Sequence, residues 1–216
     1  LGGAEGTLWD LSGMYASLSR VLTHYRPYNG RYNPKDIHPL TPFINKEKEP
    51  IRSVADRRLT DKPLLSAASI WFTYEAMSAL NRPEEEADWQ QFESMKQIAW
   101  KTGTSYGGRD AWAIGTTPRY VVGVWVGNAS GEGRPGLTGV GNAAPVLFDL
   151  FSLLPGGGWF DMPYDELEEV AICRNSGHKA SQICDQTDTL YIPRSGINTP
   201  VCPYHQLVHL SADGRF

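Results

Sequence analysis

The sequence predicts an α+β fold, in which an antiparallel sheet has flanking helices, and three observations lead to that prediction. Three apolar runs between residues 97 and 128 are separated by two short turns, which is typical of a meander of three antiparallel strands. Helical apolar spacing precedes these runs after Thr7 and follows them over residues 143–154. The helices would pack against the sheet.

Two helices are predicted before the sheet, on either side of a long polar segment. Thr7 and Asp10 form a capping-box pattern, and apolar residues then keep helical spacing. Residues from about 26 to 62 are rich in Pro, Asn and mixed charge, which indicates a loop or a short hairpin. Ser66 suits the N-cap of a second helix. That helix would run through Leu80, with Ile70, Met77 and Leu80 inward.

The predicted sheet and its last helix occupy roughly residues 97–155. In the third run, over 120–128, apolar residues occupy both sets of alternating positions, so we expect a central strand that is buried on both faces. A Gly-rich loop follows, and Pro145 then suits the first turn of a helix. The residues expected to line the buried face of that helix are Leu147, Leu150, Phe151 and Leu154.

Composition indicates a folded chain that does not bind nucleic acid. With 216 residues, of which 41% are hydrophobic, the chain is large enough for a substantial core. A formal net charge of −4 argues against nucleic acid and anionic membranes as partners. The run Glu84-Glu85-Glu86 is typical of a solvated helix start. Composition shifts after the breaker at 155–158, which predicts two parts, residues 1–157 and 158–216.

Candidate site residues stand near the end of the first predicted strand, just before a Gly-rich turn. Lys101 would place a positive charge beside an anionic group and could assist proton transfer. Gly103 has no side chain, so a substrate could lie against the backbone as an added strand. A backbone N–H just past this glycine could donate to a developing oxyanion. The hydroxyls of Thr102 and Thr104 could hold a carboxylate, and Ser105 completes the candidate substrate-binding set. The alternative is a plain edge-strand lysine followed by a turn glycine.

A Lys-Thr-Gly strand is one of three sequence elements of the serine acyl-transferases that act on penicillin and D-alanyl-D-alanine peptides. The run 101–115 closely resembles the corresponding run of class A penicillin-binding proteins, the 1C type in particular, as do residues 124–128 and 143–145. Residues 1–7 and the helix after them resemble the segment that follows the Ser-x-Asn element of that family. The resemblance covers about residues 1–155 and implies the C-terminal half of a transpeptidase domain with a partial serine β-lactamase-like fold. The nucleophile, its lysine partner and the Ser-x-Asn element would lie upstream of Leu1.

The resemblance implies a peptidoglycan D,D-transpeptidase that needs no cofactor and no metal. Lys101 would orient the substrate, Thr102 and Thr104 would hold its carboxylate, and the Thr104 N–H would complete the oxyanion hole. The implied partners are peptidoglycan stem peptides and β-lactams, at the periplasmic face of the bacterial inner membrane, with a membrane anchor upstream. One alternative is a serine β-lactamase or D,D-carboxypeptidase, against which the long tail after residue 157 counts. The other alternative is a non-catalytic scaffolding module of the same fold.

A formal Ser-x-x-Lys occurs at Ser176-Gly177-His178-Lys179, and we reject it as a catalytic motif. The motif requires the start of a helix, so that serine and lysine share one face. Here it stands between two cysteines amid Gly, Asn and Ser, which predicts a loop.

The tail contains the three cysteines of the chain. Cys173, Cys184, Cys202 and His205 are separated by ten, seventeen and two intervening residues. The short spacing of the last pair is one that zinc sites use, whereas the other spacings are loose. In the oxidising compartment that the resemblance implies, we expect a disulfide between Cys184 and either Cys173 or Cys202. Zinc is the rival, and the third alternative is a plain tail with unpaired cysteines. The resemblance further implies a linker that leads into a small β-rich domain.

Overall fold

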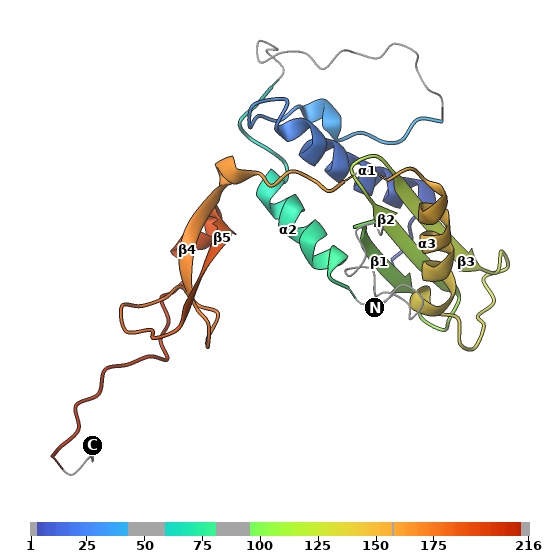
Figure 1. Ribbon diagram of the computed structural model, residues 1–216. Coiled ribbons are helices and arrows are strands. Elements are labelled where there is room, and N and C mark those ends of the chain that lie inside the picture. The colour runs from blue at the N-terminus through green and yellow to red at the C-terminus, as the bar shows by residue number, and fades with distance from the viewer. Residues whose placement is uncertain (1–3, 43–58, 81–95, 157, 213–216) are drawn as a thin grey trace. The chain divides into compact units, whose positions relative to one another are not determined.

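The computed structural model of the chain describes residues 4–42, 59–80, 96–156 and 158–212 (Figure 1). The chain divides into two compact units, Leu1–Pro163 and Tyr164–Phe216. In the described segments no helix combines the length and the apolar character that crossing a membrane requires. The helix start predicted at residues 84–86 lies outside the described residues.

The first unit is built on a three-stranded antiparallel sheet in the order β1-β2-β3. The strands are β1 (Ala99–Thr104), β2 (Asp110–Thr116) and β3 (Val121–Gly127), which confirms the predicted meander. The prediction that the third run is the central strand is wrong. β2 lies between the other two strands, whereas β3 pairs on one side only among the described residues. In β3 only Val124 is fully buried, and Trp125 is exposed.

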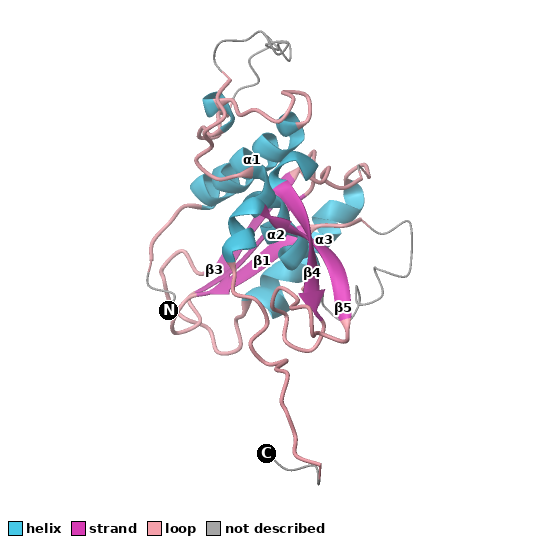
Figure 2. Ribbon diagram, turned by 90° about the vertical axis from the view of Figure 1, so that its left-hand side faces the viewer, coloured by secondary structure: helices cyan, strands magenta, loops and turns pink. Residues whose placement is uncertain are grey.

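Helices cover both faces of this sheet. Among them, α1 (Leu8–Tyr25) and α2 (Ala67–Ser78) pack around a core that includes Ala99 on β1. The third helix, α3 (Ala144–Leu153), packs on the opposite face around Trp100 of the same strand. Figure 2 shows the sheet strands among the three helices. Neighbouring residues of β1 thus point alternately into the two cores, as expected for a strand that is covered on both faces.

Local signals set the starts of the first two helices as predicted. The Oγ1 atom of Thr7 accepts a hydrogen bond of 3.0 Å from the backbone N–H of Asp10. At the start of α2, Ser66 Oγ accepts from the backbone N–H of Ser69 at 3.1 Å. Each side chain satisfies a donor that the first helical turn leaves without a partner, so the two predicted N-caps are confirmed.

Two inward-facing residues were predicted wrongly. On α3 the buried position belongs to Phe148, whose ring packs edge-on against Trp100 at 5.0 Å between centroids, while Leu150 is exposed. On the second helix Leu80 lies beyond the last turn, which ends at Ser78, and is also exposed. Because residues 148 and 150 lie on opposite sides of α3, the buried face includes Phe148 together with Leu147 and Phe151 and excludes Leu150.

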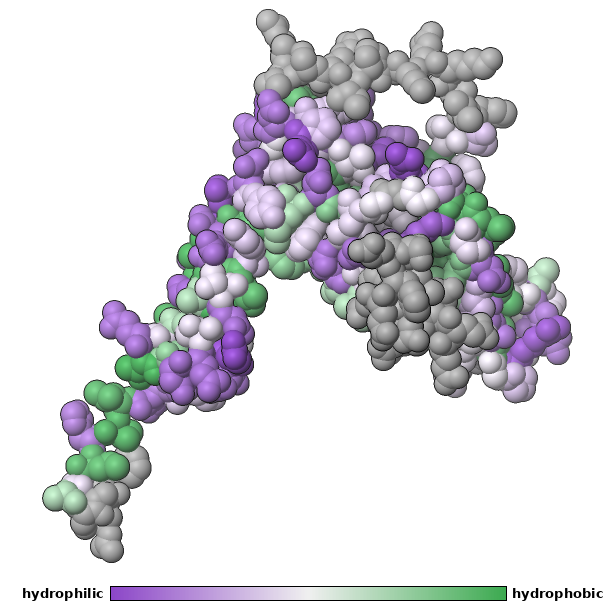
Figure 3. Space-filling model, viewed as in Figure 1, coloured by the Kyte–Doolittle hydropathy of each residue, from purple (hydrophilic) through white to green (hydrophobic). Residues whose placement is uncertain are grey.

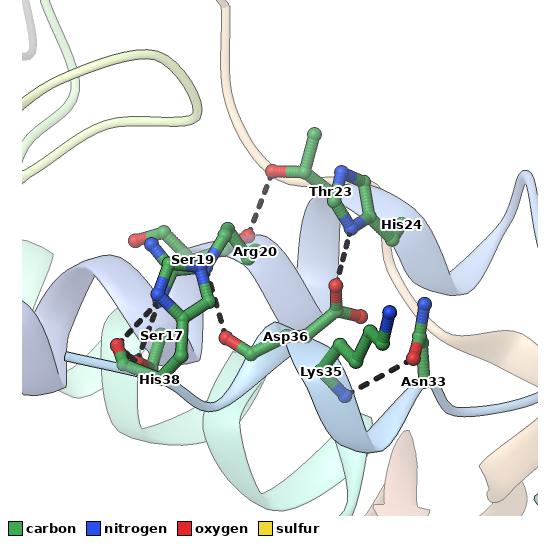
Figure 4. A network of polar contacts seen from close by, with 9 residues as sticks. All are labelled: Ser17, Ser19, Arg20, Thr23, His24, Asn33, Lys35, Asp36 and His38. Carbon is green, nitrogen blue, oxygen red and sulfur yellow. Dashed lines mark hydrogen bonds and ion pairs between the residues drawn. The ribbon is translucent and has the colours of Figure 1, made fainter. Parts of the chain in front are cut away.

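A polar network holds the segment after α1 against that helix (Figure 4). The Nδ1 atom of His24 lies 2.7 Å from Oδ1 of the buried Asp36. Arg20 donates from Nε to the Asp36 carbonyl at 2.9 Å and from Nη2 to the His38 carbonyl at 3.0 Å. Burial lowers the pKa of Arg20, and the charge of Asp36 opposes that shift. The 3-10 turn Pro34–Asp36 is thereby fixed to α1.

The second unit is an antiparallel hairpin with irregular segments around its end. Its strands, β4 (Leu167–Cys173) and β5 (Thr187–Pro193), pair in a register that sets Cys173 opposite Thr187. Within residues 164–212 only Leu167, Cys173 and Cys202 are buried. Large hydrophobic side chains elsewhere in this unit are exposed, and Figure 3 shows green atoms at its surface. The described part of this unit therefore has almost no hydrophobic core of its own.

Candidate functional site

The backbone of β1 presents one open edge beside the candidate residues. Hydrogen bonds in an antiparallel pair alternate, so every second residue turns its N–H and C=O away from the partner strand. The N–H of Ser105 donates to the carbonyl of Asp110 at 2.9 Å, and Thr104 is therefore a residue whose N–H points away from β2. Since β1 is an outer strand of the described sheet, this N–H faces its open edge.

The lysine of the motif lies at the same edge. Lys101 is exposed, and its Nζ atom donates to the carbonyl of Thr102 at 2.8 Å. Because the hydrogen bonds along β1 alternate in direction, the Thr102 carbonyl points away from β2, as the Thr104 N–H does. The ammonium group therefore lies along the open edge, where it can meet an anionic ligand without crossing any part of the sheet.

The hydroxyl of Thr104 connects β1 to a distant loop. Its Oγ1 atom accepts a hydrogen bond of 3.0 Å from the backbone N–H of Gly139. Gly139 begins a π-helical turn, Gly139–Ala143, that leads directly into α3. A Cβ at position 139 would lie 2.7 Å from the carbonyl oxygens of Gly103 and Trp112, so only glycine fits this close approach. No local sequence pattern indicates this contact.

Gly103 differs from Gly139 because nothing in the described chain requires it to be glycine. A Cβ there would make ordinary contacts with the Trp112 side chain, at 3.7 and 4.0 Å. The strand is regular at this point and pairs Gly103 with Trp112. The space above Gly103 is thus open, as the approach of a ligand backbone to this edge would require.

Ser105 belongs to the turn between β1 and β2. Its Oγ accepts from the backbone N–H of Asp110 at 2.8 Å, and the Asp110 carboxylate accepts from Trp125 Nε1 at 2.9 Å. Gly107 and Gly108 adopt φ values of 79° and 62°, which explains the two glycines in this sharp turn. These bonds hold the end of the candidate strand in place.

The Ser-x-x-Lys run of the second unit lies in the turn after β4, which confirms its rejection as a helix-borne motif. Ser176 donates from Oγ to the sulfur of Cys202 at 3.2 Å, and Lys179 donates from Nζ to the carbonyl of Ile197 at 3.0 Å. The two side chains are therefore engaged with different partners.

The expected disulfide is wrong, because Cys173, Cys184 and Cys202 are all free thiols. The structure instead gathers their sulfur atoms around the ring of His205, so these four residues could hold a metal ion. Hydrogen bonding from Ser176 is the largest of the effects that lower the pKa of Cys202 to about 5. Hydrogen bonding to Cys202 raises the pKa of His205.

The fold of the first unit, with helices and an antiparallel sheet, is compatible with a fragment of the penicillin-binding type. The chain is 30% identical over 154 residues to penicillin-binding protein 1C of Escherichia coli (strain K12), a match that covers 71% of this chain and 16% of that protein. It is 29% identical over 128 residues to penicillin-binding protein 1A of Clostridium perfringens, a match that covers 53% of this chain and 15% of that protein. No family model matches the chain. Over part of its length the chain is thus a relative of the class A penicillin-binding proteins, and it spans about a sixth of the length of the two proteins that it matches.

Proposed function

We propose that residues 1–157 form the C-terminal part of a serine D,D-transpeptidase domain, in which β1 supplies one wall of the active site. The observation that carries the proposal is the N–H of Thr104, which faces the open edge of β1 beside an exposed lysine. A preorganised backbone donor at an accessible edge is what a developing oxyanion needs. The match to two penicillin-binding proteins supports the choice of reaction.

In this proposal a serine from outside residues 1–216 attacks the penultimate D-alanine carbonyl of a stem peptide. The Thr104 N–H donates to the oxyanion of the tetrahedral intermediate. The C–N bond then breaks, and D-alanine leaves with a proton on its amine. An amine of a second stem peptide attacks the acyl-serine ester, so that a new amide forms and the serine recovers its proton.

The side chains around the open edge would position the substrate. The Oγ1 atom of Thr104 accepts from Gly139, which leaves the hydroxyl proton available for a carboxylate oxygen. Lys101 would attract the same carboxylate by its charge and assist proton movement, and Thr102 would add a second hydroxyl. With no side chain at Gly103, the peptide backbone could lie close to the strand.

The proposal extends to the setting of the protein. We infer that the full-length protein acts at the periplasmic face of the inner membrane, with its anchor and nucleophile N-terminal to this chain. Its partners would be stem peptides and β-lactams, which imitate the D-alanyl-D-alanine group. Residues 158–216 would form a Cys-containing linker that leads to a further β-rich domain.

The experiment compares Lys101→Ala with Lys62→Ala in the full-length protein that contains these residues. Lys62 is an exposed lysine far from β1 in sequence, so its replacement controls for the loss of one positive charge. We expect acylation by a fluorescent penicillin to fall roughly a hundredfold in Lys101→Ala and to be unchanged in Lys62→Ala. Equal acylation in both variants would contradict the assigned role. A parent protein that is never acylated would favour the scaffolding alternative.

A further inference from the structure

Four side chains of the second unit converge on one point from three separate segments. Nδ1 of His205 lies 3.5 Å from the sulfur of Cys173, 3.4 Å from that of Cys184 and 3.5 Å from that of Cys202. All four of these potential ligand atoms lie within 4.8 Å of one another.

These separations fit the edges of a tetrahedron around one zinc ion. Zinc lies about 2.3 Å from a cysteine sulfur and about 2.05 Å from a histidine nitrogen, and tetrahedral angles then place the sulfur and the nitrogen about 3.5 Å apart. The same geometry places two sulfur atoms about 3.8 Å apart, and the sulfur atoms of the cluster lie within 4.8 Å of one another. A disulfide, by contrast, would bring two sulfurs to about 2.05 Å and leave the third thiol and the histidine without a role.

Turns and backbone hydrogen bonds place each cysteine sulfur beside the ring of His205. Cys173 ends β4, and a turn with Gly177 at φ 70° returns the chain so that the Gly177 N–H donates to the Cys173 carbonyl at 2.8 Å. Cys184 lies in a turn in which the Ser181 N–H donates to its sulfur at 3.3 Å. The N–H of Cys202 donates to the carbonyl of Lys179 at 2.8 Å, which fixes the third segment beside the first turn.

The other ring nitrogen of His205 faces a carboxylate. Its Nε2 atom lies 3.5 Å from Oδ1 of Asp185, the residue directly after Cys184. Histidines that bind a metal commonly present their second nitrogen to a carboxylate, which fixes the ring orientation and the tautomer. Here that arrangement leaves Nδ1 free to bind the ion.

The cluster lies in a unit that has few buried apolar residues to stabilise its fold. In the described part of this unit, residues 164–212, the buried residues are Leu167, Cys173 and Cys202, and these residues form no further hydrophobic cluster. Units below about 70–80 residues with so little core usually require a disulfide or a metal. Because the three thiols are free, the structure leaves the metal as the stabilising element.

We propose that Cys173, Cys184, Cys202 and His205 bind one structural Zn²⁺ and that this ion orders the second unit. Four protein ligands complete a tetrahedral shell and leave no position for water or substrate, which is the pattern of structural rather than catalytic zinc. The mutual distances fit a single ion.

The first test measures metal and thiols in the whole 216-residue chain, purified under reducing conditions with zinc and without strong chelators. We expect one zinc per chain, and three thiols that react only after denaturation with a chelator. Stoichiometric iron, a disulfide between any two of the cysteines, or three free thiols without bound zinc would each overturn the proposal.

The second test replaces the ion and the ligands. Cobalt(II) added to the reduced, zinc-free chain should give the intense visible bands of tetrahedral cobalt and a thiolate charge-transfer band, whereas octahedral spectra would contradict the site. Cys184→Ser and His205→Ala should weaken zinc binding at least tenfold in competition with a chelator. His209→Ala is the matched control, since this exposed histidine stands four residues beyond His205, and it should bind zinc as the wild type does. Equal affinity in all three variants would contradict the assignment of the ligands.

Discussion

The Oγ1 atom of Thr104 accepts a hydrogen bond of 3.0 Å from the backbone N–H of Gly139, which lies 35 positions further along the chain. The bond joins the end of β1 to the turn that begins α3. It assigns a direction to the threonine hydroxyl, because an oxygen that accepts from Gly139 has its own proton available for another partner. One contact thus ties a candidate binding group to the packing of the first unit.

The role of this hydroxyl can be tested by two substitutions at one position in the full-length protein. Thr104→Val removes the acceptor, and we expect penicillin acylation to slow by about tenfold and the unfolding free energy to fall by about 1 kcal/mol. The rate should fall less than in Lys101→Ala, because the backbone N–H of residue 104 remains. Thr104→Ser should retain near-wild-type values. Acylation kinetics and thermal unfolding are the measurements, with the exposed Thr189→Val as control. A valine variant as fast as the wild type would exclude the role.

The two glycines at this edge should respond in opposite ways to alanine. At Gly103 a Cβ meets only ordinary contacts, so the unfolding temperature should hardly change, while acylation falls because the methyl group occupies the path of the substrate. At Gly139 a Cβ would lie 2.7 Å from two carbonyl oxygens, so stability should fall by about 1–3 kcal/mol. Thermal unfolding and acylation of each variant separate the two effects. A stable but fully active Gly103→Ala would show that no ligand backbone approaches this position.

Asp185 should support zinc binding without being a ligand. Its carboxylate faces Nε2 of His205 at 3.5 Å, so Asp185→Asn should weaken zinc affinity by about 10–100-fold while one zinc per chain still binds at saturation. Asp188→Asn is the control, because that carboxylate pairs with Arg174 and not with the histidine. Competition with a chelator measures both affinities. Equal losses in the two variants would indicate a general effect of charge on the unit rather than support of His205.

Features that depend on neighbouring residues could be predicted from the sequence. The caps at Thr7 and Ser66 involve a side chain and a backbone N–H three positions away, so the local pattern contains the whole interaction. The three-strand meander follows from short turns such as that at Gly107-Gly108, where connection length and turn residues leave few pairings.

Features set by distant contacts could not be predicted in this way. The bond from Gly139 to Thr104 depends on where a long Gly-rich loop returns to the sheet, which no local pattern encodes. The choice of Phe148 over Leu150 as the buried residue depends on the position of Trp100 on the facing strand. Both outcomes are decided by packing across elements.

The cysteine cluster shows the same limit. The pair Cys202 and His205 has the short spacing of a zinc site. The loose spacing to the other two cysteines left a disulfide, a metal and unpaired cysteines as alternatives. The choice depends on the turns that bring three segments together. The contact between Asp185 and Nε2 of His205 depends on the orientation of the histidine ring, which the sequence does not determine.

The most direct measurement of the central proposal is to map the residue that a labelled penicillin acylates. The full-length protein and the 216-residue chain alone are treated in parallel, and the labelled peptides are identified by mass spectrometry. We predict a stoichiometric adduct on a serine outside residues 1–216 in the full-length protein and no adduct on the chain alone, because Ser176 lies in a turn and donates to a cysteine sulfur. A stoichiometric adduct on Ser176, or on any other serine of this chain, would contradict the proposal that β1 serves a nucleophile supplied by another segment.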